Sequence, residues 1–561
     1  MPFSLASVLW GINIARSAGT DVAVIFGEGR ISVNWWVRDS RQKCLIGLMS
    51  VCVICCSSLV AVAADASALE AGLSKINLKD LKRHVSTLAA DSLEGREAGS
   101  RGGKAAAAYL RSELRRLRES YPVPQERTQE FGREYQNLLV LLKGSDEKLS
   151  HEVIVVGAHY DHVGYGNSNN SQGPFGQIHN GADDNASGSS ALLELIEAFS
   201  ALPTPPSRSI LFAFWDAEEV GLLGSKHWVA HPTVPLADVR FDLNIDMLGR
   251  LRNGRVITVG WRSAPGLRQI LAENNEGNQL LLAFQSRVIA DSDHHPFYAA
   301  GIPIIHLDTD KHDDYHRPSD DADKVQWDGL QLMSRFAFRI LFEMANRPEV
   351  PGFRSDVKRE PPPYWMALSG TSAAPVRIGV TWDLDAARKE TSRVAKITPD
   401  SPASNAGLRV GDRVIRLGNW ENGSFADLKT TLQLVKNPVS IRVERPGNDL
   451  PVELKANFWG QAVRLGAGWI DDPAMPQCCV ITNVVSDSPA DRAGFSAGDI
   501  VMEMGGRPLA SSEEMRLRVL EEPGPFRFRV ERHGRIRDLV VDLLDEPLPQ
   551  SRVTSSVKSG E

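Results

Sequence analysis

The sequence VIVVGAHYDH at residues 153–162, with GADDNASG at residues 181–188, decides the fold of this chain. The run from Val153 to Val156 is apolar and β-branched, which is typical of a buried strand. Gly157 is expected to let the chain turn out of the sheet just before His159. Because loops at the carboxyl ends of strands meet at one edge of an open α/β sheet, we expect His159 to belong to a site at that edge.

Later segments bring more metal-binding residue types to similar positions. They are Asp184 at the start of an apolar helix predicted over residues 186–200, Glu218 and Glu219 after the apolar run 209–215, Asp246 after the run 241–245, and His316 within residues 314–320. A lone His-x-Asp or an adjacent Glu-Glu pair is a weak signal, and each is more often part of a solvated turn. The ordered set, with its members at predicted strand and helix ends, indicates a metal site.

The residue types suggest which metal. Five candidate ligands stand out: His159, Asp184, Glu219, Asp246 and His316. Two imidazoles and three carboxylates suit Zn²⁺, but five ligands are too many for one tetrahedral ion that keeps a position open for water. They are the right number for two ions that share a bridging carboxylate. Asp161 is close enough in sequence to accept the second ring N–H of His159 and to orient that ring.

The order of these residues resembles that of the co-catalytic di-zinc aminopeptidases, a group that includes glutamate carboxypeptidases and glutaminyl cyclases. The resemblance covers about residues 75–345 and includes LEGR at 93–96, EEVGLLGS at 218–225, SDHHPF at 292–297 and YHRPSDD at 315–321. It implies two Zn²⁺ per chain, one held by His159 and Asp246 and the other by Glu219 and His316, with Asp184 bridging them. It also implies a cis peptide bond between Asp184 and Asn185.

The same resemblance makes Glu218 the general base. An unligated carboxylate beside a zinc-activated water can take its proton and later pass it to the leaving amine, which supports this role independently. Tyr315 is a candidate donor to the oxyanion, and simple packing under its loop is the alternative. The remaining nearby residues are interpreted as pocket wall or as locally satisfied histidines: Asp293 and His294 in the first class, and His162, His179, His306 and His312 in the second.

The chain begins with a targeting signal, by our interpretation. Arg41 and Lys43 precede an apolar run from Cys44 to Val62 that ends in small residues, which is typical of a secretory signal peptide cleaved after Ala63 or Ala64. We therefore expect export to the periplasm or the extracellular space. The run is nearly long enough to span a bilayer, so an uncleaved membrane anchor is the alternative. Residues 1–40 are unusual before such a signal and suggest a later true start.

With 561 residues the chain is too long for one core, and several domains are expected. Its net charge of −7 is modest and unclustered, so nucleic acid is not an expected partner. The predicted fold class is α/β: a three-layer zinc-peptidase domain with a mixed central sheet flanked by helices, plus two small β-rich PDZ-like domains. The predicted boundaries are 1–64 for the extension and signal peptide, 65–350 for the peptidase domain, 351–372 for a Pro-rich linker, 373–459 and 460–546 for the two small domains, and 547–561 for a flexible tail.

The two small domains are copies of one unit. VRIG at 376–379 recurs as VRLG at 463–466, SPA at 401–403 as SPA at 488–490, and RVER at 442–445 as RVER at 529–532. The offset is constant, which indicates a tandem repeat. We call residues 373–459 repeat 1 and residues 460–546 repeat 2. Cys478 and Cys479, in repeat 2, are the only cysteines after the leader, so no disulfide framework is expected.

Each repeat resembles a PDZ domain of the HtrA type. In that family a glycine-containing loop receives the C-terminal carboxylate of a peptide, which adds as a strand to the sheet edge. The resemblance places this loop at Ile378 and Gly379 in repeat 1 and at Leu465 and Gly466 in repeat 2. The alternative is that one or both repeats only pack on the peptidase domain as structural modules.

These observations lead to a secreted zinc aminopeptidase that removes N-terminal residues from peptide or protein substrates, with PDZ domains that recruit or position them. A carboxypeptidase or another amide hydrolase of the same family is the first alternative. An inactive peptide-binding scaffold is the second, although the intact Glu218 and ligand set argue against it. A membrane contact is expected only if the signal segment stays uncleaved.

Overall fold

The computed structural model describes residues 13–16, 22–26, 29–32, 66–372, 377–388, 392–459, 465–486, 488–522 and 524–542. The chain divides into two compact units, Met1–Ala68 and Leu69–Glu561. In the first unit, β1 (Asn13–Arg16), β2 (Val22–Phe26) and β3 (Gly29–Ser32) form an antiparallel sheet. The predicted signal segment lies outside the described residues. None of the described helices has the length and apolar character needed to cross a membrane.

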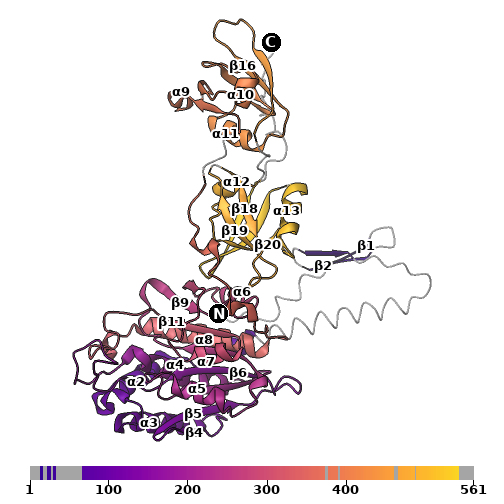
Figure 1. Ribbon diagram of the computed structural model, residues 1–561. Helices are drawn as coiled ribbons and strands as arrows, with labels where there is room; N and C mark the ends of the chain where they lie inside the picture. The colour runs from indigo at the N-terminus through magenta and orange to yellow at the C-terminus, as the bar shows by residue number, and fades with distance from the viewer. Residues whose placement is uncertain are drawn as a thin grey trace, which may run out of the picture. The chain divides into compact units, whose positions relative to one another are not determined.

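The second unit contains a mixed sheet of eight strands in the order β10-β9-β11-β8-β6-β7-β5-β4 (Figure 1). The strands are β4 (Arg127–Phe131), β5 (Tyr135–Leu142), β6 (Val153–His159), β7 (Ser209–Trp215), β8 (Val239–Ile245), β9 (Arg255–Val259), β10 (Leu281–Gln285) and β11 (Ile304–Asp308). The central strands β7, β6, β8 and β11 are mutually parallel, whereas β4, β5 and β9 add antiparallel pairs. The predicted mixed central sheet is confirmed.

The two faces of this sheet carry different helices. On one face Trp215 packs with Trp228 of α5 (Leu223–Ala230) and Phe297 of α7 (His294–Ala300). On the other, Phe212 of β7 packs with Phe199 of α4 (Gly188–Ser200), which also contacts α8 (Trp327–Asn346). Successive strand residues point to opposite faces, so the odd-numbered and even-numbered residues of β7 build separate cores. The result is the expected three-layer arrangement.

The parallel register brings the carboxyl ends of β6 and β7 to the same edge of the sheet. His159 is the last residue of β6 and lies opposite Trp215, the last residue of β7, so the next residues of both strands leave the sheet together. The predicted turn at Gly157 is wrong, because this glycine lies inside β6. A Cβ atom there would come within 2.2 Å of Trp215 Nε1, so close packing between strands explains the glycine.

A buried acid lies on α4 itself, away from this edge. Glu194 is only 1 % exposed and accepts a hydrogen bond from the Asn77 backbone N–H at 2.8 Å, just before α2 (Leu78–Leu88). Burial raises the pKa of Glu194 to about 8, and it lowers the pKa of the neighbouring His84 to about 3. Both groups are therefore neutral near pH 7, which avoids the cost of burying charge.

Glu194→Gln should flatten the pH dependence of stability. A folded-state pKa above the unfolded value means that the stabilisation is fully present below about pH 4.5 and is lost as pH rises through about 8. By this linkage the wild type should lose on the order of 3 kcal/mol relative to the variant between pH 5 and pH 9. Urea unfolding across that range tests it, with Glu197→Gln on the same helix as control. A constant difference between wild type and Glu194→Gln at all pH values would contradict the prediction.

The two repeats share most of their elements in the same order, although α9 (Leu384–Arg388) of repeat 1 has no counterpart among the described residues of repeat 2. The pairs are β12 (Val380–Trp382) with β18 (Ala467–Ile470), β13 (Val394–Ile397) with β19 (Cys479–Val484), α10 (Pro402–Asn405) with α12 (Pro489–Arg492), β14 (Arg413–Leu417) with β20 (Ile500–Met504), α11 (Phe425–Leu434) with α13 (Ser512–Glu521), β16 (Val439–Glu444) with β22 (Phe526–Arg532), and β17 (Val452–Ala456) with β23 (Arg535–Val541). Both repeats are β-rich, as predicted, and each has its own core. Cys478 and Cys479 are buried free thiols.

Candidate metal centre

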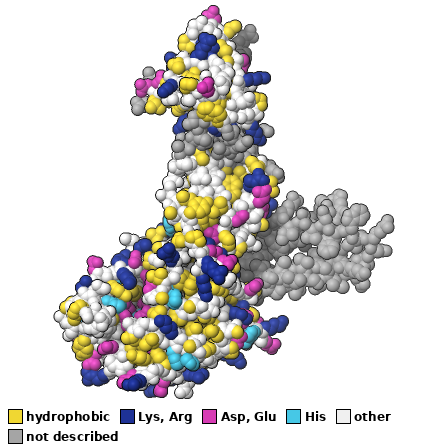
Figure 2. All heavy atoms as spheres, viewed as in Figure 1, with side chains coloured by type: hydrophobic (Ala, Val, Ile, Leu, Met, Phe, Trp, Pro, Cys, Tyr) yellow, Lys and Arg dark blue, Asp and Glu magenta, His cyan; other side chains and the backbone are white. Residues whose placement is uncertain are grey.

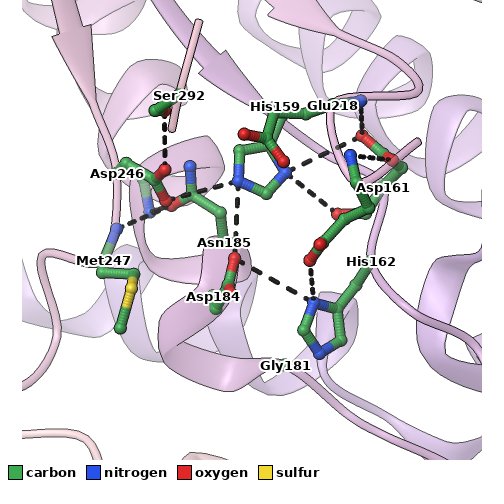
Figure 3. A network of polar contacts seen from close by, with 12 residues as sticks. His159, Asp161, His162, Gly181, Asp184, Asn185, Glu218, Asp246, Met247 and Ser292 are labelled. Atoms are coloured by element: carbon green, nitrogen blue, oxygen red, sulfur yellow. Dashed lines mark hydrogen bonds and ion pairs between the residues drawn. The ribbon is translucent and has the colours of Figure 1, made fainter. Parts of the chain in front are cut away.

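Two groups of potential ligands lie at the carboxyl edge of the sheet, and Figure 3 shows the first group together with His162. In the first, His159 Nε2 lies 3.4 Å from Asp184 Oδ1 and 3.3 Å from Asp246 Oδ1. In the second, His316 Nε2 lies 3.0 Å from Asp184 Oδ2 and 3.3 Å from Glu219 Oε2. Asp184 belongs to both groups and directs a different oxygen into each. All five ligand candidates named from the sequence are therefore brought together.

Different elements deliver these side chains. His159 ends β6, and Asp246 follows β8, the parallel neighbour of β6. Asp184 lies in a helical turn, η3 (Ala182–Ser187), that leads into α4, and its peptide bond to Asn185 is cis, as expected. Glu219 follows β7, and His316 comes from the loop after β11. The sheet therefore fixes the starting points of loops that are far apart in sequence.

The donor geometry fits zinc. Zinc binds imidazole nitrogen and carboxylate oxygen at about 2.0–2.1 Å, so two ligands of one tetrahedral ion lie about 3.3 Å apart. The four separations in the two groups run from 3.0 to 3.4 Å. Imidazole with carboxylate is also the donor set that zinc favours over calcium or magnesium.

His162 is a member of the second group that the sequence interpretation missed. Its Nδ1 lies 2.9 Å from Glu219 Oε1 and 4.0 Å from Asp184 Oδ1, and its ring packs edge-on against His316. The interpretation as a locally satisfied histidine is wrong, since His162 Nε2 has no hydrogen-bond partner among the described residues. Its position three residues after His159, in the same turn, was the available signal.

His162→Ala should weaken zinc binding at the second group by about 10- to 100-fold, because the ring orients or supplements the Glu219 ligand. The first group, which His162 does not join, should keep its affinity. Zinc titration against a chelating dye would separate the two affinities. His295→Ala, a histidine that packs on Tyr298 in α7, is the control. Equal loss of both ions in His162→Ala would show a general structural defect instead.

Asp161 organises the turn that carries the predicted base. Its Oδ1 accepts the Glu218 backbone N–H at 3.1 Å, and its Oδ2 accepts the Glu219 backbone N–H at 3.3 Å. The sequence interpretation gave this carboxylate to the His159 ring, but Oδ1 is 3.7 Å from His159 Nδ1, and the Asp161 carbonyl oxygen is closer at 3.2 Å. The carboxylate therefore positions the Glu218–Glu219 backbone, because its oxygens lie closer to these two N–H groups than to the His159 ring.

Glu218 lies beside the ligands without belonging to either group (Figure 3). It is 9 % exposed, and burial raises its pKa well above the usual range, with the neighbouring Glu219 and Asp293 carboxylates adding to the rise and His159 opposing it. A buried carboxylate with a raised pKa holds a proton more readily than an exposed one. That property suits a group that must accept and release a proton near neutral pH.

The surroundings of Asp184 and His316 favour the charged form of each side chain, whereas those of Glu218 favour its neutral form. Burial would raise the pKa of Asp184, but hydrogen bonds with His159 and His316 lower it well below its usual range. Burial would lower the pKa of His316, but Asp184 and Glu219 raise it to about 11. The carboxylates thus create a strongly negative potential, which favours positive charge at this edge, whether on imidazolium or on a metal cation.

Surrounding groups hold two of the ligands in place. Ser292 Oγ donates to Asp246 Oδ2 at 2.8 Å (Figure 3), and His316 Nδ1 lies 2.9 Å from the Asn170 carbonyl oxygen. Asn170 comes from the Gly/Asn/Ser-rich stretch between residues 164 and 176, which sequence composition marks only as a loop. Such contacts fix the ring orientation of a ligand and raise its basicity.

The other candidates take varied positions. Tyr315 stacks on His316, with ring centroids 4.0 Å apart, and burial followed by the nearby Asp184 and Glu219 charges raises the pKa of its hydroxyl. Asp293 and His294, predicted in the pocket wall, are 1 % and 0 % exposed, and Asp293 contributes to the raised pKa of Glu218. His294 stacks on His306.

Comparisons with known proteins agree with this centre. Residues 137–341 match the family model described as Peptidase family M28, and residues 465–543 match the PDZ domain model. Leupeptin-inactivating enzyme 1 of Streptomyces exfoliatus is 29 % identical over 271 residues, which cover 47 % of this chain and 57 % of that protein. Aminopeptidase YwaD of Bacillus subtilis is 27 % identical over 236 residues, which cover 38 % of this chain and 46 % of that protein.

Among solved structures, the LapA aminopeptidase of Legionella pneumophila is similar, with a TM-score of 0.44 and 23 % identity over 50 % of this chain and 75 % of that one. The chain spans about half the length of the two curated relatives above. It contains an M28 peptidase domain, of the co-catalytic zinc aminopeptidase family, and a PDZ domain that corresponds to repeat 2. The match to the PDZ domain model covers residues 465–543 and does not extend over repeat 1.

Proposed function

We propose that this protein is an exported aminopeptidase that uses two Zn²⁺ to remove N-terminal residues from peptides. The observation that carries the proposal is the position of Asp184, whose two oxygens enter different ligand groups while Glu218 lies beside both and in neither. One ion at each group would account for the whole donor set. Zinc there would lower the pKa of a shared water and polarise the scissile carbonyl.

The side chains of this chain would then divide the work. Glu218 accepts a proton from the attacking water and returns it to the leaving amine nitrogen, so that one buried carboxylate serves as base and then as acid. Asp161 keeps Glu218 in place through the backbone bond described above. Tyr315, beside His316, donates a hydrogen bond to the oxyanion that develops on the carbonyl oxygen.

The repeats would bind peptide carboxylates. In repeat 2 the Leu465 carbonyl accepts the Ala490 N–H at 2.9 Å, and the Gly466 carbonyl accepts the Val485 N–H at 2.7 Å. In a trans peptide the C=O and N–H point in opposite directions, so the next N–H groups, of Gly466 and Ala467, point away from the interior. Two successive outward N–H groups form a site for an anion.

Repeat 1 has the same loop. Its Ile378 and Gly379 carbonyls accept N–H groups at 2.9 Å, from Ala403 and Thr398. Gly379 and Gly466 have φ values of 76° and 80°, a left-handed conformation that glycine adopts readily. A Cβ at either position would also meet the Cβ of a serine at 2.1–2.3 Å, so the loop requires glycine in both repeats.

The charge pattern of the surface is consistent with peptide substrates. On the face shown in Figure 2, Lys and Arg side chains are interspersed with Asp and Glu, and they form no continuous basic band. A nucleic-acid partner would require such a band. Export through the segment before residue 65 remains part of the proposal, on the strength of its sequence alone.

Hydrolysis of free-amine aminoacyl anilides and their N-acetylated counterparts tests the activity. Chelator-sensitive cleavage of only the free-amine substrates, restored by zinc, is expected. Cleavage of acetylated peptides from the C-terminal end would instead indicate a carboxypeptidase. A protein that binds two zinc ions and peptides but cleaves neither class would support the scaffold alternative.

A further inference from the structure

A fully buried arginine lies next to the turns that carry the metal ligands. Arg96, the last residue of η2 (Asp91–Arg96), is 0 % exposed. It makes five hydrogen bonds, and all of them go to backbone carbonyl oxygens of the described residues. An arginine has five N–H donors in a rigid planar fork, so this side chain uses its full capacity. A guanidinium is rarely buried without a carboxylate partner, so its position needs another explanation.

Four of these five bonds reach two turns that carry metal ligands. We call residues 159–162 the His159 turn and residues 180–185 the Asp184 turn. The arginine Nε donates to the Tyr160 carbonyl oxygen at 2.9 Å, within the first turn. Its Nη groups donate to carbonyl oxygens of the second turn, those of Asn180 at 2.6 Å and Gly181 at 2.9 Å. One planar side chain therefore joins the two turns.

The main chain around Arg96 adds to this link. The Arg96 carbonyl oxygen accepts the N–H of His162 at 3.1 Å, and the next residue, Glu97, forms a parallel bridge with His162. The two turns also pack closely on each other. Gly181 lies beside His162 (Figure 3), and a Cβ atom on Gly181 would come within 2.5 Å of the imidazole ring. The His159 turn is therefore held by both the side chain and the main chain of one residue.

The backbone that presents this arginine is strained. Glu94, Gly95 and Arg96 have φ values of 51°, 67° and 50°, so three successive residues lie in the left-handed region. Residues other than glycine occupy this region at a cost, and surrounding contacts must maintain it. At Gly95 a Cβ atom would come within 2.4 Å of the Gly164 carbonyl oxygen, so the strained loop fits closely against the chain that follows the His159 turn. Such strain is concentrated at functional sites, which fits a role for Arg96 at the metal centre.

The charge of Arg96 offsets the charges of the nearby carboxylates. Burial lowers the pKa of the guanidinium to about 10, and the Asp184 and Asp161 carboxylates oppose this shift, so the group is positively charged near pH 7. Without a metal, the carboxylates around Asp184 repel one another. A fixed cation beside the Asp184 turn reduces that repulsion whether or not zinc is present.

We propose that Arg96 is a positioning residue that joins the His159 turn to the Asp184 turn, so that His159, His162 and Asp184 are in place before zinc binds. The inference rests on the proposed metal centre but not on peptide hydrolysis. Its effect should extend to both ligand groups, because Asp184 belongs to both. A lysine at this position would keep the charge, but its single ammonium group cannot replace donors on both sides of the fork.

Arg96→Lys should weaken zinc binding about 10- to 100-fold at both groups, the range typical of residues that orient metal ligands. Arg208→Lys is the matched control. Arg208 is also buried, at 1 % exposed, and donates to the Pro348 carbonyl oxygen at 3.2 Å. It precedes β7 and so lies at the amino end of that strand, away from the metal centre. Calorimetric zinc titration of the metal-free proteins measures the affinities, and thermal unfolding in chelator measures the stability of each variant.

The outcomes of these titrations separate the possible failures. Wild-type zinc affinity in Arg96→Lys would overturn the proposal. An equal loss of affinity in both lysine variants would also overturn it, since that result would show only a general loss of stability. If the wild-type protein itself binds no zinc, the proposed metal centre fails, and the inference fails with it.

Hydrogen exchange of the wild-type protein gives a test that does not depend on the folding of any variant. The N–H of His162, which donates to the Arg96 carbonyl, reports on the His159 turn, and the N–H of Ala186, which donates to the Gly181 carbonyl at 3.2 Å, reports on the Asp184 turn. If the turns are set before zinc binds, both amides should be protected to a similar degree in chelator and with zinc. Protection that appears only with zinc would overturn the proposal, because the metal would then order the turns.

Discussion

Glu218→Gln should lower kcat on free-amine aminoacyl anilides by about 10³-fold or more while the zinc content stays the same, since loss of a general base typically costs 10²- to 10⁴-fold. Glutamine keeps the size of the side chain and can still fill its buried position. It cannot accept a proton from water at neutral pH. Because Glu218 belongs to neither ligand group, the metal should be retained. Steady-state kinetics together with zinc analysis by mass spectrometry measure both quantities.

Glu219→Gln is the informative comparison. The two residues are adjacent, and Asp161 accepts both of their backbone N–H groups, but only Glu219 contacts His162 and His316. The Glu219 variant should lose zinc and activity together, whereas the Glu218 variant should lose activity alone. Glu218→Gln protein with more than about a tenth of wild-type kcat would remove this residue from the general-base role, because the expected loss is far larger.

Asp184→Asn should lower the zinc content from two ions to at most one and reduce kcat/KM by about 10³-fold or more. Asp184 is the one residue shared by both groups, and hydrogen bonds with His159 and His316 keep its pKa well below the usual range despite burial. An amide supplies one neutral oxygen where the carboxylate supplies two charged ones, so it cannot bridge two cations. The loss of the bridge also removes the site of the shared water, which explains the size of the kinetic effect.

Asp183→Asn is the matched control for this variant. Asp183 is the adjacent buried carboxylate, but it accepts the Gly249 backbone N–H and contacts His312, and it lies in neither ligand group. An asparagine can keep the Gly249 hydrogen bond through its own side-chain oxygen. Zinc content near two in Asp183→Asn and near two in Asp184→Asn would together contradict the bridging arrangement.

Much of the site followed from local sequence. The runs before His159 and Glu219 are short, apolar and β-branched or aromatic, and such runs form buried strands with little dependence on what surrounds them. Since side chains at the ends of parallel strands meet at one edge, the candidates could be collected from the sequence, whereas their division into two groups came from the family resemblance. The repeat was equally direct, because a constant register needs no tertiary information.

Other features depended on packing between distant segments. Gly157 looks like a turn residue in sequence, and only the approach of the Trp215 indole from β7 shows why no side chain fits there. Asp161 follows His159 by two residues, but the turn after β7 brings two backbone N–H groups closer to its carboxylate than the imidazole is. Nearness in sequence gives a poor measure of which donor is nearest in space.

The sequence by itself predicted the strands, the five ligand candidates, the unligated carboxylate beside them and the duplicated small domain, because each of these is encoded in residue type and spacing within a short segment. The tertiary structure alone decided that His162 joins the second ligand group, that Asn170 orients His316, and that Arg96 joins the His159 turn to the Asp184 turn. These contacts join residues that are far apart along the chain and that only the fold brings together. No periodicity marks them, since a single hydrogen bond or ion pair between loops leaves no pattern in the sequence around it.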